Sequence, residues 1–249
     1  MSKKVPKPIM ILSKFIFSPV IFCDNNFIII IDITKFKRHI TMKLAVFDFD
    51  STLMDGETIE FLAQELNLKE QVAEITAKAM NGELDFFESL TYRVKLLKGL
   101  PVSKVDKICH NLPMMKGGKE TISELKKAGL TVLCFSGGFK NATEYAQNIL
   151  GYDASFSNIL HSKDNTLTGL VGGEMMFSSS KGYMLKKMQS ILKITPEETM
   201  VVGDGANDLS MFEYASLKVA FCAKEILQKA ATIKINEKNL TKILDNISL

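Results

Sequence analysis

The feature that most constrains the fold is a repeated pattern along the chain. A short apolar run of strand-forming residues ends in a cluster of small or polar residues, and a helical stretch follows. The pattern starts at residues 44–49 and recurs at 130–135 and 200–202, and a further strand is expected at 217–221. Strands that alternate with helices favour a parallel sheet covered on both faces. We therefore expect an α/β fold with a Rossmann-like parallel sheet.

One stretch interrupts this alternation. Residues 57–68 and 71–97 have the apolar spacing of helices, with no convincing strand among them. We therefore expect residues 54–116 to form an inserted helical cap, and residues 42–53 and 117–249 to form the core. Turn signals within residues 154–176 predict a small hairpin in that core.

Residues 1–41 differ from the rest of the chain. Their two apolar runs, 9–22 and 27–33, fall short of the roughly 20 apolar residues that span a bilayer. No small-residue cleavage site follows them. We expect an N-terminal extension of unknown role without stable membrane association, or a translation start placed too early, with Met42 as the working start. Export or lipid anchoring at Cys23 is the alternative.

The distribution of charge and the spacing of the cysteines argue against other classes of protein. Residues 1–41 hold seven basic and two acidic residues, a net charge of +5, so the total of +3 leaves −2 for residues 42–249. A body without a basic stripe is not expected to bind nucleic acid. The four cysteines are scattered and form no C-x-x-C pair, which is typical of reduced thiols in a cytoplasmic protein: Cys23, Cys109, Cys134 and Cys222.

The first polar cluster holds two carboxylates, Asp48 and Asp50, where the first strand ends. In open parallel sheets the active site lies beyond the carboxyl ends of the strands. A carboxylate can attack phosphorus to form an acyl phosphate. A second carboxyl group can protonate the leaving alkoxide and then deprotonate the incoming water. Taken alone, the two residues also fit a strand-end turn with solvated acids.

Three further clusters follow later strands and open helices. Ser136-Gly137-Gly138 offers a hydroxyl and backbone amides for a phosphate, although Ser136 also fits an N-cap. Lys181 starts a helix, where the positive end of the helix dipole disfavours a cation. A lysine there is explained if it faces an anion, and a solvated surface lysine is the alternative. The loop at residues 203–208 supplies Asp204 and Asp208, which suit Mg²⁺ unless the loop is merely structural. Each cluster closes a strand, and the four clusters in this order form a very specific sequence pattern.

In these four clusters the chain resembles the haloacid dehalogenase superfamily of phosphatases. More narrowly, it is similar to the branch that hydrolyses O-phosphoserine, in residues 48–52 (DFDST), 135–139 (FSGGF) and 203–208 (GDGAND), together with Glu57 and Arg93. The resemblance runs from about residue 43 to near the C-terminus. It implies the fold of that superfamily, with a helical cap, and a cytoplasmic enzyme of the last step of serine biosynthesis.

The resemblance also implies roles for individual residues. Asp48 would be the nucleophile and Asp50 the acid/base. Mg²⁺ would be held by Asp48, Asp204 and the backbone carbonyl of Asp50, with Asp208 in support. The phosphoryl group would be bound by Ser136, Gly137 and Lys181, with Asn207 nearby. Glu57 and Arg93 would hold the ammonium and carboxylate of the small-molecule substrate, O-phosphoserine, and Met80 and Phe86 would line its pocket.

Two alternative functions stay open at this point. A phosphotransferase could pass the phosphoryl group from Asp48 to an acceptor alcohol such as homoserine, with the same residues. A non-catalytic phosphoamino-acid sensor could use the same cleft, but it would need neither Asp48 nor Asp50. Residues 1–41 are too short for the N-terminal regulatory domain of many bacterial relatives, so regulation through such a domain is not expected. The oligomeric state is left open.

Overall fold

The computed structural model describes residues 20–23, 27–30, 42–80 and 83–247, and it describes side chains from Met42 onward, except that of Met80. The chain divides into two units, Met1–Ile40 and Thr41–Leu249. In the first unit, β1 (Val20–Cys23) and β2 (Phe27–Ile30) pair as an antiparallel hairpin. The rest of the extension expected over 1–41 lies outside the described residues.

A seven-stranded sheet forms the centre of the second unit, in the order β6-β5-β4-β3-β7-β8-β9. All neighbouring pairs are parallel except β5 and β6, which form the hairpin expected within residues 154–176. The α/β prediction is therefore confirmed. The strands are β3 (Leu44–Phe47), β4 (Thr131–Phe139), β5 (Ala154–Lys163), β6 (Thr166–Gly173), β7 (Thr199–Gly203), β8 (Leu217–Phe221) and β9 (Ile233–Ile235).

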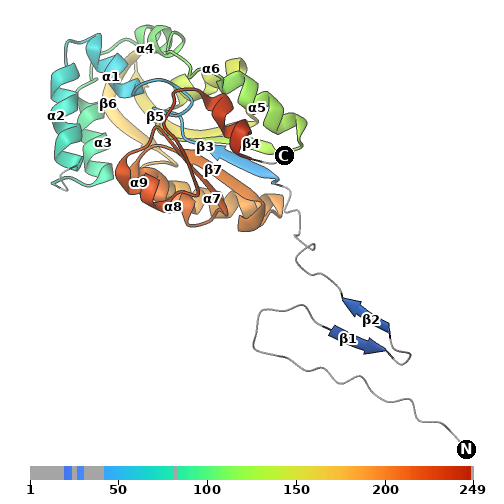
Figure 1. Ribbon diagram of the computed structural model, residues 1–249. Coiled ribbons are helices and arrows are strands. Elements are labelled where there is room, and N and C mark those ends of the chain that lie inside the picture. Colours follow the sequence, from blue (N-terminus) through green and yellow to red (C-terminus); the bar gives the residue numbers. More distant parts are fainter. Residues whose placement is uncertain (1–19, 24–26, 31–41, 81–82, 248–249) are drawn as a thin grey trace, which may run out of the picture. The chain divides into compact units, whose positions relative to one another are not determined.

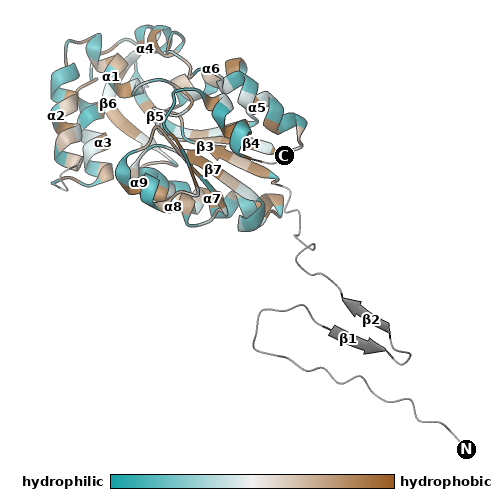
Figure 2. Cartoon of the chain, in the orientation of Figure 1, coloured by the Kyte–Doolittle hydropathy of each residue, from teal (hydrophilic) through white to brown (hydrophobic). Residues whose placement is uncertain are grey.

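The central strand β3 is buried on both faces, which explains its unbroken apolar sequence. Ala45 and Phe47 belong to the core cluster shared with α5 (Gly118–Lys127) and α6 (Lys140–Leu150). Leu44 and Val46 belong to the cluster on the other face. Figure 2 shows the apolar strands between helices with polar outer surfaces. The helices of that second cluster are α7 (Ser180–Leu192), α8 (Leu209–Phe212) and α9 (Glu225–Ala230).

Between β3 and β4 the chain forms α1 to α4 and then α5, and Figure 1 shows α1, α2 and α3 grouped beside one end of the sheet. Buried residues of these helices, such as Leu62 and Val94, belong to the same core cluster as Phe47 of β3. This helical layer therefore shares a core with the sheet. The helices are α1 (Thr58–Gln64), α2 (Lys69–Met80), α3 (Phe86–Lys95) and α4 (Val102–Cys109).

Strand β4 is longer than the sequence predicts. The prediction ended the strand at residue 135 and placed Ser136-Gly137-Gly138 at the opening of a helix over residues 139–150. In the structure β4 continues to Phe139, and α6 covers Lys140–Leu150. The cause is a non-local pairing. Phe139 is buried and pairs with Asn158 of β5, with a register shift between Phe135 and Phe139. Ser136-Gly137-Gly138 therefore lies in an irregular strand end and not at a helix N-terminus.

None of the helices in the described residues is both long and apolar enough to cross a bilayer. The described cysteines Cys109, Cys134 and Cys222 are free thiols, as predicted. The side chain of Cys23 lies outside the described part.

All the site residues expected from the sequence lie at Asp48 or later. We therefore expect a chain that starts at Met42 to stay soluble, to keep its full activity and to melt within about 2 °C of the full chain, the shift that roughly 1 kcal/mol produces in a chain of this size. The measurement is a thermal melt and an activity assay of both chains. Insolubility, or a marked loss of activity, would show that residues 1–41 support the catalytic core.

Candidate active site

The sheet order brings the first and fourth polar clusters together. Strand β3 lies between β4 and β7, and the chain crosses to opposite sides of β3, which is the arrangement that opens a crevice at the carboxyl ends of the strands. Asp48 directly follows β3, and its N–H donates to Val202 O of β7 at 2.9 Å. Asp204 directly follows β7. Both carboxylates line one cavity of about 460 Å³.

At the base of this cavity a buried lysine joins two carboxylates. Lys181 Nζ lies 2.6 Å from Asp48 Oδ1 and 2.6 Å from Asp208 Oδ1, and all three side chains are almost fully buried. Burying charges is costly unless they are paired in good geometry, as they are here. The structure therefore excludes the solvated surface lysine that the sequence left open for Lys181, which faces anions as a cation at the start of α7 should.

Asp208 uses its second oxygen to shape the loop after β7. Its Oδ2 accepts hydrogen bonds from the backbone N–H of Asp204 and of Gly205, both at 3.0 Å. The close approach of the Asp208 carboxylate to the loop backbone requires a glycine at position 203, because a Cβ there would lie 2.3 Å from Asp208 Oδ2. With one oxygen bound to Lys181 and the other to the backbone, Asp208 orients the loop, and the side chain of Asp204 is left facing the cavity.

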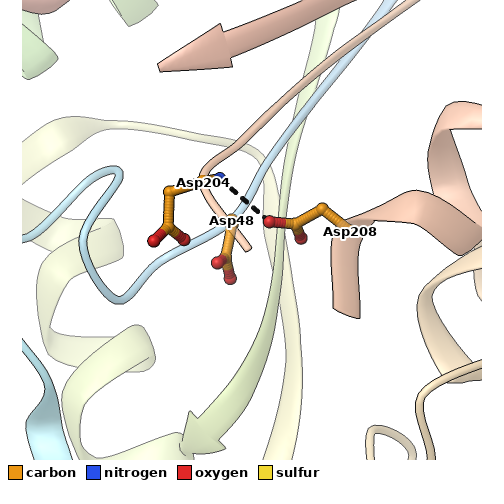
Figure 3. A group of neighbouring side chains, drawn as sticks. All are labelled: Asp48, Asp204 and Asp208. Carbon is orange, nitrogen blue, oxygen red and sulfur yellow. Dashed lines mark hydrogen bonds between the residues drawn. The ribbon is translucent and has the colours of Figure 1, made fainter. Parts of the chain in front are cut away.

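The three aspartates form a group suited to a metal ion. Ligand atoms of Asp48, Asp204 and Asp208 all lie within 4.8 Å of one another, and Figure 3 shows the three side chains converging. Three carboxylates against the single ammonium of Lys181 leave a formal charge of −2 in a largely buried site. A divalent cation would neutralise this excess, and carboxylate oxygens are the ligands that hard cations prefer. The donor set therefore fits a divalent metal.

The same charge excess appears in the proton affinities of these groups. Burial, reinforced by the charge of Asp208, raises the pKa of Asp48 well above its ordinary value. The same two causes raise the pKa of Asp204 to about 7. Burial alone would lower the pKa of Lys181, but Asp208 and Asp48 outweigh it and hold that pKa above its ordinary value, so the lysine stays charged.

Asp50 lies on the loop after β3 and is oriented by the cap. Its Oδ1 accepts from the Thr58 N–H at 2.7 Å and from Thr58 Oγ1 at 2.5 Å. Its Oδ2 faces Gly138, where a Cβ would lie 2.6 Å from that oxygen. Burial raises the pKa of Asp50, and the hydrogen bonds from Thr58 oppose that rise. A carboxyl group with a raised pKa is suited to donating a proton.

The expected phosphate cradle lies opposite Asp204, at the end of β4. Ser136 is fully buried, and its Oγ accepts from the Gly138 N–H at 2.9 Å. Gly137 lines the cavity, and its carbonyl accepts from Asn158 Nδ2 at 3.0 Å. The ring of Phe86 stands over Gly137, because a Cβ there would lie 2.9 Å from Phe86 Cζ. The backbone at Gly137 is thus anchored from β5 and covered by the cap.

Glu57 and Arg93 place a carboxyl group and a guanidinium on the side of the cavity formed by the helical layer. Glu57 precedes α1, and its Oε1 accepts from Ser51 Oγ at 3.0 Å. Arg93 lies on α3, and its Nε donates to Ser89 O at 3.2 Å. Burial, and then the charges of Asp50 and Asp204, raise the pKa of Glu57 to about 8. Both side chains are mostly buried, which differs from the solvated surface charges that their positions alone would suggest.

The structure brings together nearly all the site residues expected from the sequence. Those that line the cavity are Asp48, Asp50, Glu57, Phe86, Arg93, Gly137, Asp204 and Asn207. Ser136, Lys181 and Asp208 are buried beside it, and the side chain of Met80 lies outside the described ones. Sequence reasoning missed Thr58, whose only signal was its place directly after Glu57 at a helix start. It also missed Ser178 and Lys224, which line the cavity.

Comparison with known proteins agrees with this fold. The family model of haloacid dehalogenase-like hydrolases matches residues 42–216, and the chain belongs to this family. A curated relative from Wolinella succinogenes, named phosphoserine phosphatase, is 59% identical over 83% of this chain and 100% of the relative. A phosphoserine phosphatase from Methanocaldococcus jannaschii is 48% identical over 82% of this chain and 97% of the relative.

Solved structures give the same result. One described as a phospho-aspartyl intermediate analogue of phosphoserine phosphatase has a TM-score of 0.79 and 47% identity, over 84% of this chain and 100% of that chain. Another, described as a substrate-bound phosphoserine phosphatase complex, has the same TM-score and identity, over 84% of this chain and 99% of that chain. The fold class inferred from the sequence, and the membership of the superfamily, are confirmed.

The pKa of Glu57 makes stability depend on pH. A carboxyl group with a raised pKa in the folded state contributes stability below its unfolded pKa, near 4.5, and loses it as pH rises through about 8. Glu57→Gln stays neutral and escapes this loss. Without metal, its free energy of unfolding should match that of the wild type at pH 5 and exceed it at pH 9 by about 2–4 kcal/mol.

The measurement is urea unfolding of both proteins in EDTA at the two pH values. The control is Glu120→Gln, a change at an exposed residue of α5, which should leave the difference between pH 5 and pH 9 unaltered. An equal effect of Glu57→Gln at both pH values would contradict the buried, proton-binding state of Glu57.

Proposed function

We propose that this protein hydrolyses O-phospho-L-serine to L-serine and phosphate through a phospho-aspartate on Asp48, as the last step of serine biosynthesis. The observation that carries the proposal is the placement of Asp48. It lies at the base of the cavity, next to Lys181 and the Asp204 loop, with Glu57 and Arg93 on the cap side. The names of the relatives and of the solved structures support the same substrate.

In the first step, a carboxylate oxygen of Asp48 attacks phosphorus and the bond from phosphorus to the seryl oxygen breaks. Lys181 offsets negative charge at this point, since its Nζ lies 2.6 Å from Asp48 Oδ1. Ser136 and the Gly137 amide are proposed to bind the equatorial oxygens, on which charge accumulates. Asn207 lines the same part of the cavity and is proposed to lie near the phosphate.

Asp50 is the proposed acid and base. Its carboxyl group protonates the leaving seryl oxygen, and it then takes a proton from the water that attacks the phospho-aspartate. Hydrolysis of the phospho-aspartate by this water returns Asp48 to its carboxylate form. The raised pKa of Asp50 supports this role, because it keeps a proton available on a group that faces the cavity.

The proposed cofactor is Mg²⁺, held by Asp48, Asp204 and the backbone carbonyl of Asp50, with Asp208 in support. When bound, the ion would supply positive charge that reduces repulsion between the anionic substrate and the carboxylates. The formal charge of −2 at the aspartate group supports a divalent ion. We also propose that residues 54–116 act as a cap on a core of residues 42–53 and 117–249, and that the enzyme is cytoplasmic.

The cap side of the cavity is proposed to select the substrate. O-Phosphoserine carries an ammonium and a carboxylate on one carbon, which match Glu57 and Arg93. A guanidinium can bind a carboxylate through two parallel hydrogen bonds, which a lysine cannot reproduce. Phe86, standing over Gly137, is proposed to line the pocket together with Met80. An ammonium in the pocket would also favour the ionised form of Glu57, against the burial that raises its pKa.

The test compares three phosphate esters in wild type, Arg93→Lys and Glu57→Gln. We expect Arg93→Lys to lower kcat/KM for O-phosphoserine, mainly through KM, by a factor that corresponds to about 2–4 kcal/mol of lost transition-state stabilisation. The same variant should change kcat/KM little for phosphoethanolamine, which lacks the carboxylate. Glu57→Gln should likewise lower kcat/KM for O-phosphoserine but change it little for 3-phosphoglycerate, which lacks the ammonium.

The measurement is phosphate release, with Mg²⁺ and with EDTA. The matched control is Lys95→Ala, a change at an exposed cation two residues further along α3, which should leave all three values unchanged. Similar wild-type kcat/KM values for the three esters would contradict the assignment of O-phosphoserine. Full activity in EDTA would contradict the metal.

A further inference from the structure

A residue outside the expected site makes two hydrogen bonds to one oxygen of the acid/base. Thr58, the first residue of α1, is fully buried. Its N–H lies 2.7 Å from Asp50 Oδ1 and its Oγ1 lies 2.5 Å from the same oxygen. Thr58 belongs to the helical layer, whereas Asp50 belongs to the loop after β3. The contact therefore joins the proposed cap to the proposed proton donor.

These two hydrogen bonds determine which oxygen of Asp50 can carry a proton. A carboxyl oxygen has two lone pairs, and Oδ1 uses both to accept from Thr58. The proton of the neutral acid then sits on Oδ2. That oxygen faces the irregular end of β4, since a Cβ on Gly138 would lie 2.6 Å from it. Asp50 and Gly138 both line the cavity.

We propose that Thr58 is a positioning residue, which fixes the carboxyl group of Asp50 so that Oδ2 presents its proton to the oxygen of the leaving alcohol. This inference rests on the proposed function. Thr58 does not touch the reacting atoms and acts only through Asp50.

The two chemical steps both use Oδ2. In the first, a bond forms between a carboxylate oxygen of Asp48 and phosphorus, the bond from phosphorus to the seryl oxygen breaks, and the electron pair of that bond passes to the seryl oxygen. The seryl oxygen takes the proton of Asp50 Oδ2. In the second, Oδ2 takes a proton from water, the water oxygen bonds to phosphorus, and the bond to Asp48 breaks with its electron pair returning to Asp48.

The position of Thr58 also couples proton transfer to substrate recognition. Thr58 directly follows Glu57, which is proposed to hold the substrate ammonium. One short segment thus sets the place of the ammonium and the orientation of the acid. A substrate that is correctly bound at Glu57 then finds the proton donor aligned with its leaving oxygen.

A purely structural role makes different predictions. An aspartate that accepts the first free N–H of a helix stabilises that helix as a cap does. In that case the loss of the Thr58 hydroxyl would lower stability and would affect all substrates equally. A positioning role slows the first step, formation of the phospho-aspartate, only for those substrates whose leaving group needs a proton.

The experiment compares O-phosphoserine with p-nitrophenyl phosphate, whose nitrophenolate leaves without protonation. Thr58→Val removes the hydroxyl but keeps the shape and the N–H. We expect the rate of alcohol release from O-phosphoserine, followed in a single turnover, to fall about 10- to 100-fold while KM stays within about threefold, and the same rate for p-nitrophenyl phosphate to fall less than about threefold. Thr58→Ser, which keeps the hydroxyl, should restore the single-turnover rate for O-phosphoserine to within about threefold of wild type.

A matched control and a double variant sharpen the test. Thr121→Val removes a fully buried threonine hydroxyl that has no hydrogen-bond partner among the described residues. This variant should leave the rates with both substrates unchanged. In an Asp50→Asn background, Thr58→Val should cause no further loss on O-phosphoserine, because both changes act on one proton transfer.

A wild-type rate of alcohol release from O-phosphoserine in Thr58→Val, an equal loss of the single-turnover rate on both substrates, a Thr58→Ser variant as slow as Thr58→Val, or an additive loss in the Asp50→Asn background would each overturn the inference. If circular dichroism shows Thr58→Val unfolded at the assay temperature, Thr58→Ala takes its place with the same expectations. A wild-type protein that does not hydrolyse O-phosphoserine would overturn the proposed function, and this inference with it.

Discussion

The buried contact of Lys181 with Asp48 and Asp208 is the interaction on which the rest of the site depends. An unpaired charge at this depth would cost several kcal/mol, so each member requires the others. The three residues come from the end of β3, the start of α7 and the loop after β7, which are far apart in the sequence. Only the parallel sheet brings these points together. The chemistry of the site thus requires the fold.

The same contact leaves the site short of positive charge. One ammonium cannot balance Asp48, Asp204 and Asp208, and burial together with the charge of Asp208 raises the pKa of both Asp48 and Asp204. In the proposed function, a metal ion and directed donors at the end of β4 complete the charge balance for a phosphoryl group. The sheet side of the cavity would then supply chemistry common to many phosphate esters, and Glu57 and Arg93 of the helical layer would supply selection.

Contacts between the helical layer and the core join these two tasks. Thr58 binds Asp50 inside the cavity. Further out, the rings of Phe87 on α3 and Phe177, which follows β6, stack with centroids 5.4 Å apart and an interplanar angle of 11°. The proposed selection by the helical layer and the proposed catalysis by the core thus depend on one packed arrangement.

The sequence was sufficient for features that are local. Apolar runs and the polar clusters after them identified β3, β4 and β7, and with them Asp48 and Asp204, because burial on both faces of a sheet leaves a continuous apolar pattern. Features that depend on distant partners were not predictable. The extension of β4 to Phe139 needs its pairing with Asn158. The role of Thr58 needs the packing of α1 against the loop that carries Asp50.

The most direct test of the account is to trap the covalent intermediate. The protein is mixed with O-phosphoserine labelled with ³²P and Mg²⁺, quenched in acid within milliseconds, and digested for peptide mapping. The account predicts an acid-stable, hydroxylamine-sensitive label on the peptide that contains Asp48, and no label in Asp48→Asn. Rapid phosphate release without any labelled peptide, or a label on another residue, would contradict the phospho-aspartate on Asp48.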